Sequence, residues 1–598
     1  MSFFLIQFME GLASASSLFL VAAGLSLIFG VTRIINFAHG SLYMLGAYMA
    51  WTLSGPLGFW LAVPLAALIT ALAGILLECS LLRRIYRTPE LFQLLATFAV
   101  TLIAEDMVSL LWGPDDMLGP RAPGLKGSVD LFGHAFPAYD LFLIAVGPAV
   151  MAGLWLLLKG TRFGILVRAA SADREMLAAL GVDQTRLFTA VFALGALLAG
   201  LGGALELPRA AIHPAMGTPV VVSAFVIVVV GGLGSLPGAF LAALLIGELS
   251  AFGVYLWPKA TLVLMFAVMA LVLALRPRGL MGKSTPDAAD SPAGTAPMLP
   301  SPRLWAGLAL TGLFFALVPL AGDAYATTVA SEILIMALFA ASLSLVTALG
   351  GMTCFGQAAW FGIGAYAAAL AHPALGMEGA LLAALLAGFL GGWCFARPAV
   401  RHAGITLAML TLALAAIIHS LAMQLYGLTG GDNGILGIWP SDWAASPETF
   451  HLFVLVIVGL AFVFLWRLAA SPFGFAARAV RDQPARAEAI GIDSRRTRAL
   501  AFAIGAALAA LAGGLFAYLK GSVFPDTASI ATSVDALVML LLGGIGSLAG
   551  PILGAGLHTL LKVGLSSHSD LWRMAVGAIL ILLVVGFPGG LLGRMKRP

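Results

Sequence analysis

The sequence predicts an all-α integral membrane protein with two parallel repeats of about nine to ten transmembrane helices each. Hydrophobic residues make up 61% of the 598 residues and charged residues only 10%, which is unlike a soluble domain. Apolar runs of about 18–22 residues recur, each long enough to cross the hydrocarbon core of a bilayer. Because these runs are continuous rather than alternating, they favour helices over barrel strands.

Nineteen apolar segments are predicted membrane spans. Nine lie in the first half, at 11–31, 41–54, 59–80, 91–112, 140–159, 187–206, 219–232, 237–256 and 258–275. Ten lie in the second half, at 303–321, 330–349, 353–372, 376–396, 403–426, 450–467, 498–518, 534–544, 548–566 and 570–587. Several are short, which is also typical of broken or re-entrant helices.

The distribution of basic residues predicts the orientation. With the N-terminus outside, most of the 32 Lys and Arg residues fall in loops on the inner side. By the positive-inside rule these loops face the cytoplasm, together with the C-terminus. The net charge of +4 follows from this bias, so we expect no nucleic-acid partner.

An internal repeat organises the chain. Thr161–Asp183 returns 310 residues later as Ser471–Asp493, and Phe37–Tyr48 returns as Phe355–Tyr366. The Gly-rich stretch Gly231–Gly238 also has a second copy. The apolar segment at 303–321 has no counterpart in the first half. It restores the orientation of the second half, so the two halves are predicted to be parallel.

Three regions follow from this repeat: a first half at 1–282, a linker at 283–302 and a second half at 303–598. The linker is rich in Pro, Ser and Ala, which is typical of a flexible connection. No stretch has the spacing of a phosphate-binding loop. We therefore expect this chain to bind no cofactor, and any ATP and Mg to be bound by partner subunits.

The two charged stretches at 161–183 and 471–493 predict a docking surface for a two-fold symmetric partner. Each is predicted to hold one short helix, with Ser171 or Asp482 as its cap, and Pro484 fits the first turn of the second. The candidate contacts are Arg168, Asp173, Arg174, Glu175, Gly181, Arg478, Arg481, Asp482, Arg486 and Gly491. The alternative is that these arginines only fix the membrane orientation.

A polar stripe on one predicted helix is a candidate solute path. Thr97, Thr101 and Glu105 share a helix face, and Thr411 and His419 stand at equivalent positions of the second half. The alternatives are hydrogen bonds between helices, or a place for Glu105 near the outer headgroups. His39 and Gln357 form another equivalent pair. These side chains could contact the solute or pack between helices, and we favour the packing role.

Together these motifs resemble the permease subunits of bacterial ABC importers for branched-chain amino acids. Residues 1–282 resemble the LivH-type subunit through N-F-A-H-G at 36–40 and G-A-Y at 46–48. Residues 303–598 resemble the LivM-type subunit through F-G-I-G-A-Y at 361–366, T-G-G-D-N-G at 429–434 and R-A-V-R-D at 478–482. The resemblance implies a type II importer fold in the bacterial inner membrane.

The resemblance also implies partners. Two ABC ATPase subunits, of one or two kinds, would receive the coupling stretches, and a periplasmic solute-binding protein would deliver the solute. The solute would be a branched-chain or other hydrophobic amino acid; amides, urea or aromatic carboxylates are alternatives. The chain would be a permease and not an enzyme. An ATP-independent secondary transporter is the alternative of another class, although it normally needs more ionisable groups at depth than Glu105 and His419.

Overall fold

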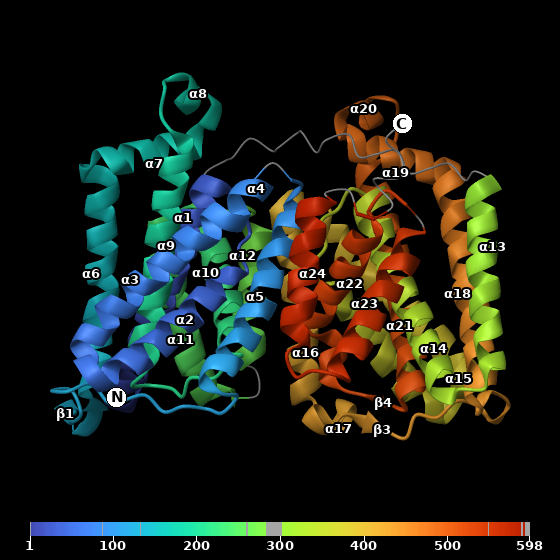
Figure 1. The fold of residues 1–598 in the computed structure, drawn as a ribbon, viewed down its shortest axis with the longest axis horizontal. Coiled ribbons are helices and arrows are strands. Elements are labelled where there is room, and N and C mark those ends of the chain that lie inside the picture. The colour runs from blue at the N-terminus through green and yellow to red at the C-terminus, as the bar shows by residue number, and fades with distance from the viewer. Residues whose placement is uncertain are drawn as a thin grey trace. The chain divides into compact units, whose positions relative to one another are not determined.

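The computed structural model describes residues 2–86, 88–131, 133–258, 261–282, 302–547, 549–587 and 590–591. The predicted linker at 283–302 lies outside them except for Pro302. The chain forms two compact units. Unit 1 is Met1–Thr285 with Asp570–Val585, and unit 2 is Pro286–Ser569 with Gly586–Pro598. Figure 1 shows the helices of both units.

The described residues of unit 1 form mainly helices, with a short antiparallel hairpin of β1 (Ser128–Leu131) and β2 (His134–Pro137) and an isolated bridge between Met117 and Ile212. Its helices are α1 (Ser2–Thr32), α2 (Ala38–Leu57), α3 (Phe59–Leu77), the π-helix Glu78–Leu82, α4 (Arg83–Ile85), α5 (Glu90–Trp112), α6 (Ala138–Gly160), α7 (Arg162–Ala172), α8 (Arg174–Ala179), α9 (Gln184–Glu206), α10 (Gly217–Gly231), α11 (Leu236–Leu256) and α12 (Thr261–Leu275). Helix α24 (Trp572–Gly586), apart from its last residue, also belongs to unit 1.

The helices of unit 2 begin with α13 and then follow the order of the main helices of unit 1 up to α11. They are α13 (Pro302–Leu317), α14 (Ala324–Ser344), the π-helix Leu345–Leu349, α15 (Gln357–Ala399), α16 (Gly404–Gln424), α17 (Tyr426–Thr429), α18 (Pro447–Ala470), α19 (Pro472–Asp482), α20 (Pro484–Ala489), α21 (Ser494–Lys520), α22 (Ile530–Gly543) and α23 (Gly550–Ser566). Short 3-10 helices cover Val318–Ala321, Gly431–Asn433, Asp442–Ala444 and Pro525–Ala528. Strands β3 (Ile435–Leu436) and β4 (Ser522–Val523) pair antiparallel.

The predicted apolar segments all fall on helices. Within the described residues, eleven helices are long and apolar enough to cross a membrane, and five more apolar helices are shorter. The predicted starts at 11 and 353 are wrong, because α1 begins at Ser2 and α15 begins at Gln357. The segments at 353–372 and 376–396 follow each other without a loop in α15, where Gly376 forms a kink at a φ of 66°.

Helix α13 is the predicted extra helix without a counterpart. It lies beside α18 (Figure 1). The buried ring of His451 joins α18 to the helices α13 and α14. Its Nε2 lies 2.9 Å from Phe315 O on α13, and its Nδ1 lies 2.9 Å from Ser331 Oγ on α14.

Small residues bring helix backbones into contact at matching places of the two units. A Cβ atom on Gly203 of α9 would lie 2.0 Å from Tyr43 O on α2. A Cβ atom on Gly513 of α21 would lie 1.9 Å from Phe361 O on α15. Such approaches between membrane helices require glycine. The internal repeat of the sequence is therefore also a repeat of helix packing.

Candidate functional site

Each of the two charged stretches contains two short helices, where the sequence predicted one. In unit 1, α7 leads into α8, and in unit 2, α19 leads into α20. In each unit this helix pair lies at the end opposite to the short strands (Figure 1). The boundary before the first helix of each pair does carry a breaker, Gly160 before α7 and Pro472 at the start of α19, which the prediction of a single helix did not use. We call α7–α8 and α19–α20 the coupling pairs.

Hydroxyl side chains begin the first helix of each coupling pair. Thr161 Oγ1 accepts a hydrogen bond from Gly164 N at 3.1 Å, and Ser471 Oγ accepts one from Gly474 N at 3.3 Å. These four residues occupy equivalent positions of the repeat. The caps satisfy backbone donors that the first turn of a helix leaves free.

The predicted caps Ser171 and Asp482 are wrong. Asp173 caps α8, where its Oδ1 accepts a hydrogen bond from Met176 N at 3.0 Å. Ser171 lies inside α7 and donates to Arg168 O, and Asp482 is the last residue of α19. A capping residue needs extended backbone geometry, which Asp173 has at a φ of −149° and a ψ of 108°.

Glycines end α8 and α20, as predicted. Gly181 and Gly491 have φ values of 82° and 89°, a region that glycine enters without steric cost. The amide that follows Gly181 bonds to Leu177 O, and the amide that follows Gly491 bonds to Ala487 O. This is the pattern of a Schellman motif, so both coupling pairs have a fixed end.

Exposed apolar residues stand among the predicted contact charges. The charged side chains that are exposed are Arg168, Asp173, Glu175, Asp482 and Arg486. Leu180 is 73% exposed and Ile490 is 75% exposed, at equivalent positions after α8 and α20. Large apolar groups held in the open within a polar surface are typical of a protein interface.

Arg174 points into unit 1. Its Nη2 donates a hydrogen bond to Val31 O at the end of α1, and its guanidinium lies 5.4 Å from the centre of the Phe188 ring. Burial lowers the pKa of Arg174, and the nearby charge of Arg33 lowers this pKa further. Arg174 therefore fastens α8 to α1.

Arg481 makes the corresponding contact in unit 2. Its Nη1 donates to Ala348 O in the π-helix that continues α14, at 2.5 Å, and its Nε donates to Asp482 Oδ1 at 2.7 Å. Its stem lies on Gly351, where a Cβ atom would approach Arg481 Cγ to 2.4 Å. Only 13% of the Arg481 side chain is exposed. We call the bonds of Arg174 and Arg481 to these carbonyls the arginine latches.

In each unit a second hydrogen bond joins the segment that follows α1 or α14 to a helix predicted to line the solute path. Phe37 N donates to Thr97 Oγ1 on α5 at 3.3 Å, and Phe355 N donates to Thr411 Oγ1 on α16 at 3.0 Å. Both threonines are buried, and the buried Thr101 donates to Thr97 O. The structure places these three predicted path residues in contacts between and within helices.

His39 and Gln357 also lie in helix contacts. His39 is fully buried with Nε2 2.9 Å from Val21 O on α1, and its Nδ1 has no hydrogen-bond partner within the described residues. Gln357 Nε2 donates to Ser342 Oγ at 2.8 Å and to Gly505 O at 3.3 Å.

Glu105 belongs to a polar cluster on three helices of unit 1. Its Oε1 accepts from Thr218 Oγ1 on α10 at 3.2 Å, and its Oε2 pairs with Arg573 Nη1 on α24 at 3.4 Å. The next residue, Asp106, accepts from Met574 N at 2.7 Å and so caps the start of α24. In unit 2, His419 Nδ1 lies 3.0 Å from Pro525 O, before α22.

Comparison with known proteins identifies the family. A family model described as the branched-chain amino acid transport system permease component matches residues 7–273 and matches again at 325–585. The chain belongs to this permease family. The permease therefore carries two copies of the family domain, in agreement with its repeat of helices.

Individual relatives match one half each. The permease is 30% identical to the high-affinity branched-chain amino acid transport system permease protein BraD of Pseudomonas aeruginosa, over 47% of this chain and 96% of that protein. It is 29% identical to LivH of Salmonella typhimurium, over 47% of this chain and 96% of that protein. It is 29% identical to LivM of Escherichia coli, over 45% of this chain and 70% of that protein. The permease is thus a fusion of a LivH-like and a LivM-like half.

Some contacts of the permease escape sequence reasoning. Arg573 and Asp106 are ordinary charges near the ends of apolar runs. The contacts of Arg573 with Glu105 and of Asp106 with Met574 N join segments 468 residues apart in the chain. The arginine latches are hidden for another reason. Arg174 aligns with Pro484, and Arg481 aligns with Ser171, so the repeat does not pair them.

Proposed function

We propose that the permease forms the membrane path of an ATP-driven importer for branched-chain or other hydrophobic amino acids in a bacterial inner membrane. The observation that carries this proposal is the repeated exposure of Leu180 and Ile490 on the coupling pairs. A docked partner removes these apolar side chains from water, which stabilises the complex. The capped and glycine-terminated helices around them are rigid enough to transmit force.

The partners at this surface are two ABC ATPase subunits, which bind ATP and Mg. The charges beside the exposed apolar groups differ between the coupling pairs, because Glu175 aligns with Ala485 and Met176 aligns with Arg486. The subunits are therefore of one or two kinds. A periplasmic solute-binding protein delivers the solute to the opposite side of the membrane.

The arginine latches supply a route from the coupling pairs to the transport helices. When an ATPase displaces α8, Arg174 pulls on Val31 O at the end of α1. The chain that follows α1 is bonded to Thr97 on α5, the helix that carries Glu105. In unit 2, Arg481 begins the corresponding route to α16, which carries Thr411 and His419.

The solute path is proposed along α5 and α16, with Glu105 and His419 as the groups that change partners during transport. Thr97, Thr101 and Thr411 lie buried on these two helices, and His39 and Gln357 lie buried in contacts between neighbouring helices. Amides, urea or aromatic carboxylates remain the alternative solutes for the same architecture. The binding protein decides between them, since it selects the solute before the permease receives it.

A docking experiment tests the proposal. The variants Leu180→Glu and Ile490→Glu place a charge where an apolar contact is expected, and we expect each to lower the ATPase that co-purifies with the permease by about tenfold or more. The control is Leu436→Glu, which changes a residue that is 67% exposed at the other end of unit 2.

Normal ATPase recovery with both coupling variants would contradict the proposal. Solute accumulation by the permease alone, with no ATPase or ATP, would instead support the ATP-independent secondary transporter.

A further inference from the structure

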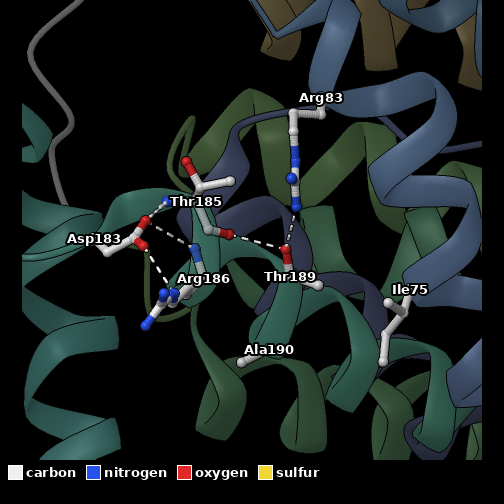
Figure 2. Close-up of a pocket in the computed structure, with 7 residues that line it drawn as sticks. All are labelled: Ile75, Arg83, Asp183, Thr185, Arg186, Thr189 and Ala190. Carbon is white, nitrogen blue, oxygen red and sulfur yellow. Dashed lines mark hydrogen bonds and ion pairs between the residues drawn. The ribbon is translucent and has the colours of Figure 1, made fainter.

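Unit 1 contains a cavity of about 670 Å³ beside the start of α9 (Figure 2). Its polar side is formed by Arg83, Asp183, Thr185, Arg186 and Thr189. Its apolar side is formed by Ile75 on α3 and Ala190 on α9. The cavity opens where α9 leaves the coupling pair, which is where the predicted topology puts the inner headgroup layer of the membrane.

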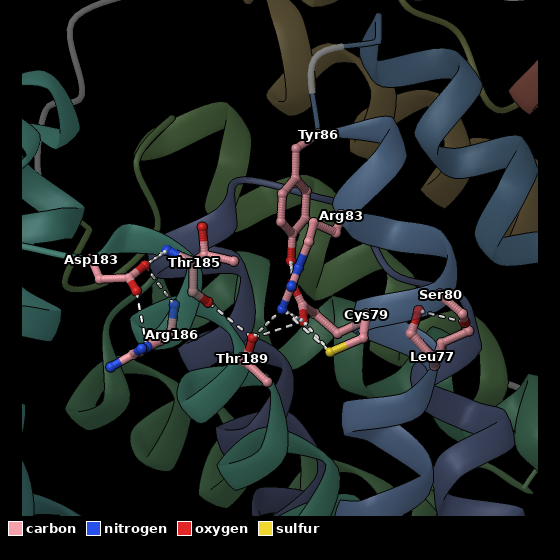
Figure 3. A network of polar contacts seen from close by, with 10 residues as sticks. Leu77, Cys79, Ser80, Arg83, Tyr86, Asp183, Thr185, Arg186 and Thr189 are labelled. Atoms are coloured by element: carbon pink, nitrogen blue, oxygen red, sulfur yellow. Dashed lines mark hydrogen bonds and ion pairs between the residues drawn. The ribbon is translucent and has the colours of Figure 1, made fainter.

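A buried carboxylate holds one cationic wall of this cavity in place. Glu78 is fully buried in the π-helix and pairs with Arg83 Nη2 at 3.1 Å. Tyr86 Oη donates to Glu78 at 3.0 Å, and Thr189 Oγ1 donates to it at 2.8 Å. Figure 3 shows Arg83 reaching toward Thr189 within this network. A π-helix of this kind often marks a functional position.

The guanidinium of Arg83 keeps donors for a ligand. Within the described residues, its hydrogen bonds to Glu78, Cys79 and Thr189 all come from Nη2. Because a guanidinium has five N–H donors, Nε and Nη1 remain for another acceptor. The side chain of Arg83 is 41% exposed, so an acceptor can reach it from the cavity.

The second pair of charges determines which ligand fits. Arg186 pairs with Asp183 at 3.0 Å, and both side chains are exposed. With Glu78 neutralising Arg83 and Asp183 beside Arg186, the cavity has both signs of charge and no net excess. A ligand with a phosphate and a primary ammonium group matches both signs, whereas a purely anionic headgroup meets repulsion from Asp183.

The outer surface of α3 supplies a place for acyl chains. Leu68, Leu72 and Leu76 are 52%, 65% and 73% exposed, and they follow one face of the helix toward Ile75. In a membrane protein this exposed apolar face contacts lipid. Basic pockets at the cytoplasmic ends of membrane helices are known to hold lipid headgroups.

The repeat offers an internal comparison. Gly74 and Gly392 make the same close approach to α9 and α21, with a Cβ atom 2.5 Å from Ala196 and Ala506. With this alignment, Trp393 stands at the position of Ile75, and Leu500 stands at the position of Ala190. The positions of Glu78 and Thr189 are alanines, Ala396 and Ala499. Arg83, Asp183 and Arg186 recur as Arg401, Asp493 and Arg496, so what is particular to unit 1 is the buried Glu78, the two threonines and the small Ala190.

We propose that this cavity binds the headgroup of phosphatidylethanolamine from the inner leaflet. The phosphodiester accepts hydrogen bonds from Nε and Nη1 of Arg83 and from the hydroxyl of Thr185. The ammonium group pairs with Asp183. The bound lipid then steadies the start of α9, next to the coupling pair.

The test measures lipid retention by native mass spectrometry of the full chain, released from nanodiscs of phosphatidylethanolamine, phosphatidylglycerol or phosphatidylcholine. We expect the first lipid to be retained most. Asp183→Asn keeps an oxygen for the caps at Thr185 N and Arg186 N but loses the charge. We expect it to lower retention of phosphatidylethanolamine by up to about fivefold, the equivalent of an exposed ion pair.

The matched control is Asp493→Asn, which changes the equivalent cap of α21 and should leave retention unaltered. Ala190→Leu introduces the residue that stands at the equivalent position of unit 2, Leu500, and enlarges the cavity wall, so we expect it to abolish selective retention. Equal retention of all three lipids by the wild-type chain would overturn the proposal. So would unchanged retention in both Asp183→Asn and Ala190→Leu. Binding of soluble phosphoethanolamine, with no lipid retained, would assign the site to a water-soluble phosphate ester and would also overturn the proposal.

Discussion

At the scale of single residues, Arg174 and Arg481 make equivalent bonds from different places in the repeat. Arg174 donates to a carbonyl at the end of α1, and Arg481 donates to a carbonyl in the π-helix that continues α14. Helices α1 and α14 stand at equivalent positions of the repeat. A charged group donating to a backbone carbonyl contributes about 1.5–3 kcal/mol, more than a neutral hydrogen bond. The latches are thus strong enough to move with the coupling pairs.

Replacement of a latch should uncouple transport without loss of docking. We expect Arg481→Gln to keep the co-purifying ATPase but to lower solute uptake per ATP hydrolysed by about tenfold. The control is Arg495→Gln, which changes an exposed arginine in the first turn of α21 that is not among the candidate contacts. Uptake and hydrolysis measured together check this, and equal loss in the two variants would argue against the latch.

The residues after the latches show why sequence reasoning stopped short of them. Arg33 has a φ of 56°, which is unfavourable for any residue with a Cβ atom, and Gly351 has a φ of 65° at the equivalent position. A lone glycine or arginine gives no signal of this geometry. The charges of the coupling stretches were predicted, but which arginines point inward depends on tertiary contacts.

At the scale of helices, the apolar runs predicted the existence of the main elements and missed details of their ends. Long apolar segments dictate helices because lipid offers no partner to a free backbone group. The ends depend on single caps, such as Thr161 for α7 and Asp173 for α8. Helix α7 was missed as a separate helix although Gly160 precedes its cap Thr161, because a single Gly and Thr are weak signals of a break.

Close helix packing gives a prediction for stability. Gly203→Leu forces a side chain into the contact with Tyr43 O, and we expect it to lower the stability of unit 1 by about 1–3 kcal/mol. Gly153→Leu in α6 is the control, because a Cβ atom on Gly153 meets nothing within 4 Å. Thermal unfolding in detergent measures both. A lower melting temperature for the control than for Gly203→Leu would contradict this packing account.

At the scale of the whole molecule, the two halves of the chain share one family domain and one arrangement of helices. The family match at 7–273 and 325–585 and the equivalent contacts of Gly203 and Gly513 agree with the predicted repeat. The extra helix α13 was also predictable. Each repeat is predicted to cross the membrane an odd number of times, so one more crossing is needed for the two halves to be parallel. Contacts between distant segments, such as Arg573 with Glu105, could not be predicted because nothing local specifies them.

The central claim is that ATPase subunits drive the permease through the coupling pairs. The most direct measurement is uptake of labelled leucine by proteoliposomes that contain the permease, its ATPases and its binding protein. We predict accumulation that requires ATP and the ATPases, and that is lost in the double variant Leu180→Glu with Ile490→Glu. Accumulation by the permease alone, or full ATP-driven uptake by the double variant, would contradict the claim.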